Sequence, residues 1–225
     1  MPNDNPSGPQ RFRLLVFDWD GTLADSTTII AEAIQQACRD LGLPPPDDAA
    51  ARFVIGLGLA DALRHVAPSL PPADYPRLSE RYREHYLARD PGIPLFGGAR
   101  EMLADLDARG FLLAIATGKS RTGLARALAQ QRLAHRFVAS RCADEGFPKP
   151  HPDMLLALMD RCGVEPVETL MIGDTTHDLA LARNAGASAL AVTYGAHTSE
   201  GLSGFAPLAT VASIAELAAW LAANA

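Results

Sequence analysis

The segment Leu14-Leu-Val-Phe-Asp-Trp-Asp-Gly-Thr-Leu23 decides the fold that we expect for this chain. Four apolar residues, Leu14 to Phe17, run without a polar break into two carboxylates that stand one residue apart, Asp18 and Asp20. An uninterrupted apolar run of this length is typical of a strand that is buried on both faces of a parallel sheet. In open α/β sheets, ligands bind beyond the carboxyl ends of the strands, so the two aspartates mark a candidate site.

Strand and helix patterns alternate in the chain beyond residue 90. Apolar runs predict further strands at residues 111–116, 137–139, 169–172, 187–192 and 208–211, with amphipathic helices between them. Residues 27–90 are instead helical throughout, with Asp25 and Ser26 as the candidate caps of the first helix. This order favours a doubly wound, Rossmann-like parallel sheet with an all-helical segment inserted after the first strand. The predicted parts are a disordered lead-in at 1–11, an α/β core at 12–26 and 91–225, and the helical insertion at 27–90.

Composition and charge exclude several classes of protein. The chain has 225 residues, of which 48% are hydrophobic, and a formal net charge of −6, with nothing that resembles a basic stripe for nucleic acid. No apolar run is long enough to span a bilayer, and the first residues lack the apolar region of a secretory signal. Cys38, Cys142 and Cys162 match neither a disulfide framework nor a zinc pattern. We therefore expect a cytoplasmic protein with unpaired thiols that binds neither nucleic acid nor a membrane.

Polar clusters follow three of the predicted strands, and a fourth cluster lies in a loop before a helix. They are Asp18 with Asp20, Thr117-Gly118-Lys119, Asp174 with Asp178, and Lys149 between two prolines. Because the carboxyl ends of parallel strands share one edge of a sheet, these clusters should converge on one pocket. Carboxylates at close range repel one another unless a cation joins them, and a site with oxygen ligands alone suits Mg²⁺.

Such a set of side chains suits phosphoryl transfer. The Asp18 carboxylate can attack phosphorus and form an aspartyl phosphate, while Asp20 gives a proton to the leaving oxygen and then takes one from water. Lys149 and the metal ion would neutralise charge on the transferring group. The Thr117 hydroxyl and the loop amides can donate hydrogen bonds to phosphate oxygens.

The four clusters, in this order, resemble the four motifs of the haloacid dehalogenase superfamily. The matching segments are Asp18–Leu23, Thr117–Gly118, Lys149 and Gly173–Asp178, and the resemblance covers nearly the whole chain from Phe12 on. The helical insertion is similar to the four-helix, C1-type cap of the phosphoglycolate phosphatase-like branch, so we call residues 27–90 the predicted cap. Trp19 departs from the pattern, since the family usually carries Phe or Leu there, but this apolar exchange leaves the catalytic positions unchanged.

The resemblance implies a role for each residue of the site. Asp18 is the nucleophile and Asp20 the acid/base. Mg²⁺ is held by Asp18, the main-chain carbonyl of Asp20 and Asp174, with Asp178 helping directly or through water. The expected phosphate-binding residues are Gly21, Thr22, Thr117, Gly118 and Lys149. A glycine-marked loop of the predicted cap is expected to close over the site and select the substrate; its residues are Arg52, Gly56, Leu57 and Gly58.

The most direct interpretation is a Mg²⁺-dependent phosphatase that acts on a small phosphorylated metabolite, with phosphoglycolate phosphatase as the nearest named activity. A phosphomutase of the β-phosphoglucomutase type, a haloacid dehalogenase and a non-catalytic binding protein are the alternatives. The motifs specify neither the substrate, which the cap selects, nor whether the protein is a monomer or a homodimer. We expect Lys119 to face solvent and His177 to be a surface loop residue.

Overall fold

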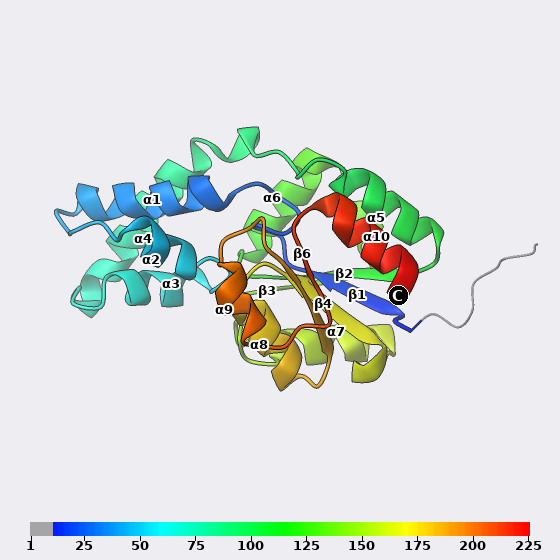
Figure 1. Ribbon diagram of the computed structural model, residues 1–225. Helices are drawn as coiled ribbons and strands as arrows, with labels where there is room; N and C mark the ends of the chain where they lie inside the picture. The colour runs from blue at the N-terminus through cyan, green and yellow to red at the C-terminus, as the bar shows by residue number, and fades with distance from the viewer. Residues whose placement is uncertain (1–10) are drawn as a thin grey trace, which may run out of the picture.

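Six parallel strands form one sheet in the order β3-β2-β1-β4-β5-β6 in the computed structural model of this protein (Figure 1). The structure describes residues 11–225, so the predicted lead-in at 1–11 lies outside the described residues except for Arg11. The strands are β1 (Leu14–Phe17), β2 (Leu112–Thr117), β3 (Ala139–Cys142), β4 (Thr169–Gly173), β5 (Ser188–Val192) and β6 (Thr210–Val211). The predicted doubly wound parallel sheet is therefore confirmed.

Strand β1 lies in the middle of the sheet, between β2 and β4. All four of its residues are buried, because both faces of the sheet are covered. Leu15 and Phe17 contribute to the hydrophobic core on one face, while Leu14 and Val16 contribute to the core on the other. A strand covered on both sides has no polar position, which explains the unbroken apolar run in the sequence.

Helices pack on both faces of the sheet and bury these two cores (Figure 1). The helices that pack against Leu15 and Phe17 are α5 (Ala99–Ala108), α6 (Arg121–Gln131) and α10 (Ile214–Asn224). The opposite face is covered by α7 (Asp153–Cys162) and α8 (Thr176–Asn184). Three shorter helices complete this part of the chain: η3 (Ala134–Arg136), η4 (Pro166–Glu168) and α9 (Ser199–Ser203).

The predicted cap contains helices and no strand over residues 27–90, all of which the structure describes. Its elements are α1 (Thr27–Asp40), α2 (Asp48–Phe53), α3 (Leu59–Val66), η1 (Pro72–Asp74) and α4 (Tyr75–Leu87), and η2 (Asp90–Gly92) returns the chain to the sheet. These helices have a small hydrophobic cluster of their own, which includes Cys38, Leu63 and Leu78. They lie beyond one end of the sheet (Figure 1). That they form a separate domain stays our proposal.

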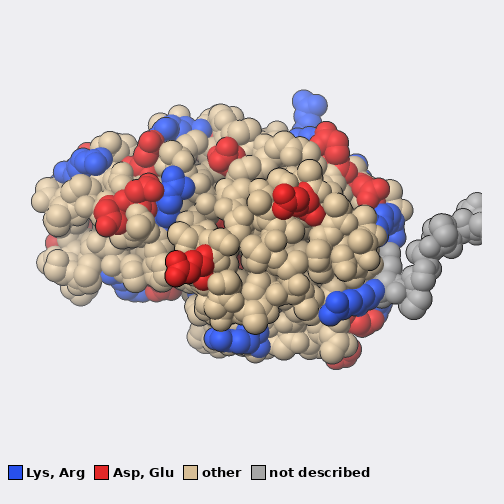
Figure 2. Space-filling model, viewed as in Figure 1, with Lys and Arg blue, Asp and Glu red and all other residues tan. Residues whose placement is uncertain are grey.

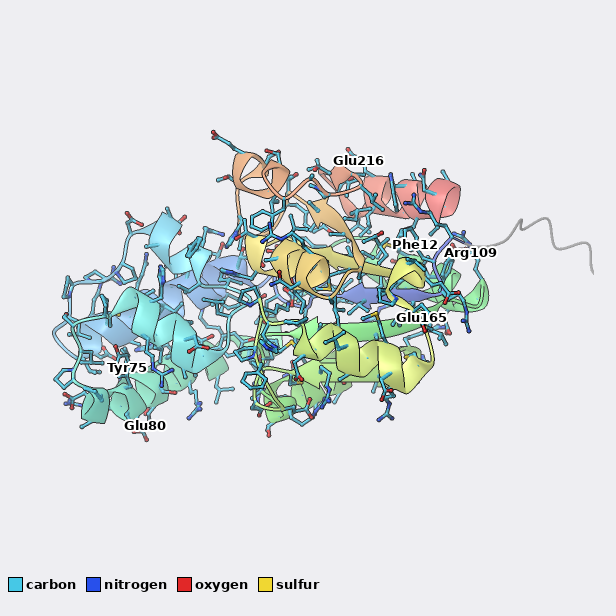
Figure 3. The ribbon with its side chains drawn as sticks, turned by 90° about the horizontal axis from the view of Figure 1, so that it is seen from below. Phe12, Tyr75, Glu80, Arg109, Glu165 and Glu216 are labelled. Carbon is cyan, nitrogen blue, oxygen red and sulfur yellow. The ribbon has the colours of Figure 1, made fainter. Side chains whose placement is uncertain are left out.

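Figure 3 shows how far this arrangement extends. Tyr75 and Glu80 lie at the outer end of the helical segment, whereas Phe12, Arg109 and Glu165 lie at the opposite end of the molecule. Residues 11–13 lead into β1, so this opposite end is the amino edge of the sheet. The carboxyl edge therefore faces the predicted cap.

The third strand differs from its expected position. Residues 137–139 are the most apolar of this region, but the ladder with β2 runs from Ala139 to Cys142, where Ala139 pairs with Ala114. Val138 is 49% exposed, and Ser140 is bound by the Arg121 guanidinium. β3 is an edge strand with a half-polar sequence, so apolar periodicity alone misplaces it.

Acidic and basic side chains are interspersed over the face shown in Figure 2, with wide uncharged areas between them. No basic stripe is visible on that face. Within residues 11–225, no helix has the length and apolar character needed to cross a membrane.

Candidate active site

The strand order brings the predicted site residues to one place. Asp18 follows β1, Thr117 is the last residue of β2, and Asp174 follows β4, so all three lie at the carboxyl ends of adjacent strands. Asp18, Asp174 and Asp178 each offer a carboxylate oxygen within 4.8 Å of the others. Thr117 is fully buried beside them. The predicted convergence of the clusters follows directly from β1 having β2 and β4 as its neighbours.

Lys149 enters this group from the loop before α7 and is buried. Its Nζ donates to Asp18 Oδ1 at 2.7 Å and to Asp178 Oδ1 at 2.6 Å. Burial alone would lower the pKa of the Lys149 amine, but the charges of Asp178 and Asp18 outweigh it and raise that pKa. Lys149 is therefore a fixed ammonium between two carboxylates.

Asp18 has one oxygen that no donor reaches. Its Oδ2 is the only buried side-chain oxygen or nitrogen without a hydrogen-bond partner among the described residues. Burial raises the pKa of the Asp18 carboxyl well above its usual range, while Lys149 opposes that rise. A buried oxygen without a hydrogen-bond partner costs free energy. Asp18 Oδ2 is therefore suited to bind a ligand. The site holds three carboxylates and one ammonium, so negative charge is in excess. All three candidate ligands are oxygen atoms, which suits a hard divalent cation.

Asp174 occupies space that two glycines leave open. A Cβ on Gly21 or on Gly195 would lie 2.2 Å from Asp174 Oδ2. The Thr22 hydroxyl donates to Asp174 Oδ1 at 2.8 Å, and the Ala196 amide donates to Oδ2 at 2.7 Å. Thr22, expected at the phosphate, thus uses its hydroxyl to orient Asp174. Burial, followed by the charge of Asp178, raises the pKa of Asp174 to about 7.

Asp178 lies in the first turn of helix α8 and is engaged at both oxygens. Its Oδ2 accepts from the Thr175 amide at 3.1 Å and from the Thr175 hydroxyl at 2.6 Å, as in a capping box. Its Oδ1 accepts from Lys149. Asp178 therefore caps the helix and positions Lys149 at the same time.

Asp20 is held at Oδ1 by a hydrogen bond and by an ion pair. The Ser26 hydroxyl donates to that oxygen at 2.7 Å instead of capping α1, and Lys119 Nζ lies 3.0 Å from it. The side chain of Lys119 is only 9% exposed, so the expectation that it faces solvent is wrong. The Lys119 amide also donates to Thr117 Oγ1 at 3.2 Å. No local sequence pattern indicates these contacts, because Lys119 and Asp20 lie far apart in the chain.

The glycine-marked loop of the predicted cap, Gly56–Gly58, lies against the carboxyl edge of the sheet. A Cβ on Gly118 would be 2.5 Å from the Leu57 carbonyl oxygen and 2.6 Å from the Gly56 carbonyl oxygen. On the other side of the loop, a Cβ on Gly56 would be 3.2 Å from Thr175 Oγ1. The loop is therefore packed between the segments that follow β2 and β4, and we call it the cap loop.

Arg52, predicted to act with this loop, is used elsewhere. Its guanidinium donates to Asp48 Oδ2 at 2.8 Å, to Thr27 Oγ1 at 3.0 Å and to Thr28 Oγ1 at 3.2 Å. These partners lie at the starts of α1 and α2. The structure thus brings Gly56, Leu57 and Gly58 to the site and directs Arg52 towards α1.

Two histidines that follow β4 and β5 join the core to the predicted cap. His177 Nε2 and His197 Nε2 donate to the Phe53 carbonyl oxygen at 2.8 and 3.0 Å. The Thr176 amide donates to His197 Nδ1 at 3.0 Å, which leaves the proton of neutral His197 on Nε2. Burial lowers the pKa of both imidazoles. The expectation of a surface loop for His177 is wrong, because this residue is buried under the end of α2.

Comparison with known proteins gives consistent matches. The sequence profile of the family described as haloacid dehalogenase-like hydrolase matches residues 15–192. The chain is 38% identical over 211 residues to the probable phosphatase IndB of Dickeya dadantii, and the aligned region covers 91% of each chain. It is 34% identical over 224 residues to a phosphoglycolate phosphatase of Vibrio vulnificus, covering 92% of this chain and 95% of the relative. The crystal structure of a hydrolase from Pseudomonas syringae superposes with a TM-score of 0.86 at 25% identity, over 96% of this chain and 99% of that one.

Proposed function

The chain belongs to the haloacid dehalogenase-like hydrolases and is a phosphatase of that family, and from this premise we propose that it hydrolyses a small phosphomonoester through a phosphorylated Asp18. The observation that carries the proposal is the Asp18 carboxylate. Lys149 holds its Oδ1 at 2.7 Å, while its buried Oδ2 has no partner among the described residues. A carboxylate fixed in this way is oriented for attack on a ligand before the ligand binds.

In the first step, an oxygen of Asp18 forms a bond to phosphorus as the bond from phosphorus to the ester oxygen breaks. Asp20 gives its proton to the departing oxygen, which leaves as an alcohol. The Lys149 ammonium and the Thr117 hydroxyl bind the equatorial phosphoryl oxygens, whose charge they stabilise.

In the second step, the Asp20 carboxylate takes a proton from water, and the water oxygen bonds to phosphorus. The bond between phosphorus and Asp18 breaks, which releases inorganic phosphate and restores both carboxyl groups to their starting states. Asp178 keeps Lys149 in place throughout, because it accepts from the ammonium at 2.6 Å.

We propose Mg²⁺ as the metal ion. The residues that would hold it are Asp18, Asp174 and the main-chain carbonyl of Asp20, with Asp178 acting directly or through a water. Their oxygen-only donor set and the unpartnered Asp18 Oδ2 support this assignment. When bound, the ion neutralises charge on the carboxylates and on the phosphoryl oxygens.

Three alternatives call for different chemistry at the same positions. A phosphomutase of the β-phosphoglucomutase type would exclude water and return the phosphoryl group to a bound intermediate. A haloacid dehalogenase has no alkoxide to protonate, so Asp20, which Ser26 and Lys119 hold in place, argues against it. A non-catalytic binding protein does not require Asp18, Asp20 and Lys149 together.

The substrate that we propose is a small phosphorylated metabolite in the cytoplasm, such as phosphoglycolate, because one relative is a phosphoglycolate phosphatase. The test measures inorganic phosphate released from phosphoglycolate, glycerol phosphate, hexose phosphates and nucleoside monophosphates, with Asp18→Asn as the control. We expect phosphate from at least one compound, none from the variant, and no isomer of any sugar phosphate. Isomerisation without phosphate release would establish the phosphomutase instead.

A further inference from the structure

We propose that Lys119 and Tyr86 are positioning residues that fix Asp20 for proton transfer when helix α4 lies against the core. With Asp90 and Arg126 they form a chain of contacts that we call the Asp20 anchor. This inference rests on the proposed function, because it takes Asp20 as the acid/base. It adds a physical link between the predicted cap and one step of the reaction.

Lys119 is the centre of the anchor. Its Nζ lies 3.0 Å from Asp20 Oδ1 and donates to the Tyr86 hydroxyl at 2.7 Å. The same Nζ lies 4.8 Å from the centroid of the Tyr86 ring, in a cation–π arrangement. Burying an ammonium costs solvation energy, which attraction to well-placed partners must offset. A lysine that is 9% exposed and has these two partners is therefore held in one position.

The contacts leave only one oxygen of Asp20 for chemistry. Oδ1 accepts from the Ser26 hydroxyl at 2.7 Å as well as lying beside Lys119. A hydroxyl donor and an adjacent ammonium at the same oxygen restrict the rotation of the carboxyl group. Oδ2 is then the atom that can carry the proton to and from the reacting oxygen.

Tyr86 extends the anchor from the core to the helical segment. It belongs to α4, and burial raises the pKa of its phenol, which keeps the hydroxyl protonated. Asp90, at the start of η2 where the chain returns to the sheet, acts on Tyr86 through its charge, which raises the pKa of the phenol further. Asp90 Oδ2 accepts in turn from Arg126 Nε of helix α6 at 2.5 Å. The anchor thus connects Asp20, α4, the returning linker and α6.

The consequence concerns movement of the predicted cap. If α4 moves away from the core, the Tyr86 hydroxyl no longer contacts Lys119. The Lys119 ammonium can then turn into solvent and lose its contact with Asp20. Proton donation to the leaving group would then fail, whereas Asp18 and Lys149 would keep their own contact. The anchor therefore matters for substrates whose leaving group needs a proton.

The experiment compares two leaving groups in the full-length, Mg²⁺-loaded protein. The substrates are an alkyl phosphate from the panel above and p-nitrophenyl phosphate, whose nitrophenolate departs without a proton. For Lys119→Met we expect kcat/KM for the alkyl phosphate, which reports the steps up to departure of the leaving group, to fall about 10- to 100-fold, a sizeable part of what general acid–base catalysis supplies, with a much smaller loss for p-nitrophenyl phosphate. The later proton transfer from water to Asp20 is common to both substrates and affects kcat for both. Tyr86→Phe should show the same selective loss to a lesser degree, and Lys119→Arg should recover part of the activity. Asp20→Asn is the reference for the selective pattern.

Matched controls come from the same helix. Tyr75→Phe removes a phenolic hydroxyl that donates to the Ala67 carbonyl at 2.8 Å, at the outer end of α4 (Figure 3). Arg77→Met removes an exposed cation from α4. Both variants should keep the wild-type kcat for both substrates.

Equal losses of kcat/KM on both substrates in Lys119→Met would overturn the proposal, since a merely structural residue gives that pattern. So would an increase in KM alone for anionic substrates, which would make Lys119 a substrate-binding group. In either case the wild type would remain active and the proposed function would stand. A wild-type protein that hydrolyses neither substrate would instead refute the proposed function, and the anchor with it.

Discussion

Replacing Gly118 with alanine would place a methyl group between the core and the cap loop. The added Cβ would lie 2.5 Å from the Leu57 carbonyl oxygen, whereas ordinary contact begins at 3.4 Å, so the loop would have to retreat by about 0.9 Å, the difference between the two. The atoms that it meets are backbone atoms of Gly56 and Leu57, which cannot rotate away as a flexible side chain does. The substitution therefore opposes the closed position of the loop.

The expected size of the effect follows from the cost of overpacking, which is roughly 1–3 kcal/mol. If the closed arrangement is the one that reacts, the whole cost falls on kcat/KM, which decreases about 5- to 150-fold at about 1.4 kcal/mol for each factor of ten. The midpoint of thermal unfolding should change little, because the loop can retreat without unfolding the sheet.

Steady-state phosphate release measures this effect, and Gly97→Ala is the matched control. A Cβ on Gly97 meets nothing within 4 Å, and its backbone does not need a positive φ, so this variant should keep the wild-type kcat/KM. If Gly118→Ala also keeps the wild-type value, the cap loop does not approach Gly118 during turnover, and the reasoning is refuted.

Three further outcomes concern the carboxylates. Asp18→Asn should abolish phosphate release, since an amide does not attack phosphorus, while the circular dichroism spectrum stays that of the folded protein. A chelator should abolish release, and Ca²⁺ should not restore it, because its looser coordination misplaces the nucleophile. The metal-free protein should lose stability to urea as pH rises from 3.8, the usual pKa of Asp174, to about 7, its raised folded value. Over that range the folded state keeps a proton that the unfolded state has released, with a slope of at most about 1.4 kcal/mol per pH unit.

Each of these outcomes has a clear contrary result. If Asp18→Asn released phosphate at the wild-type rate, Asp18 would not be the nucleophile. A full rate without any divalent ion would remove the metal site. A pH slope that persists unchanged in Asp174→Asn would show that another group causes it.

The sequence predicted the sheet because its central strand carries a clear pattern. Four apolar residues followed by Asp18 and Asp20 are typical of a strand that is buried on both faces and ends at a site. The prediction that Asp18, Thr117 and Asp174 share one edge of the sheet followed from strand parallelism, and the strand order then places them on neighbouring strands. Predictions of this kind succeed because they depend on periodicity and chain direction.

Contacts between distant segments could not be predicted in this way. Lys119 and His177 were assigned to the surface, yet their partners are Asp20 and the Phe53 carbonyl, which local patterns do not indicate. Ser26 was expected to cap α1, but its hydroxyl binds Asp20 instead. A polar side chain near a sheet edge has several possible partners, and only the packed structure selects one.

The central position of β1 also determines when the site can form during synthesis. The proposed nucleophile, Asp18, is made among the first residues of the chain, but one neighbour of its strand, β4, begins only at Thr169. Because chains emerge from the ribosome N-terminus first, Asp18 is synthesised long before Asp174 and Asp178. A nascent or truncated chain that lacks β4 therefore carries Asp18, the proposed nucleophile, without Asp174 and Asp178 beside it, and we expect phosphatase activity only once β4 has joined the sheet.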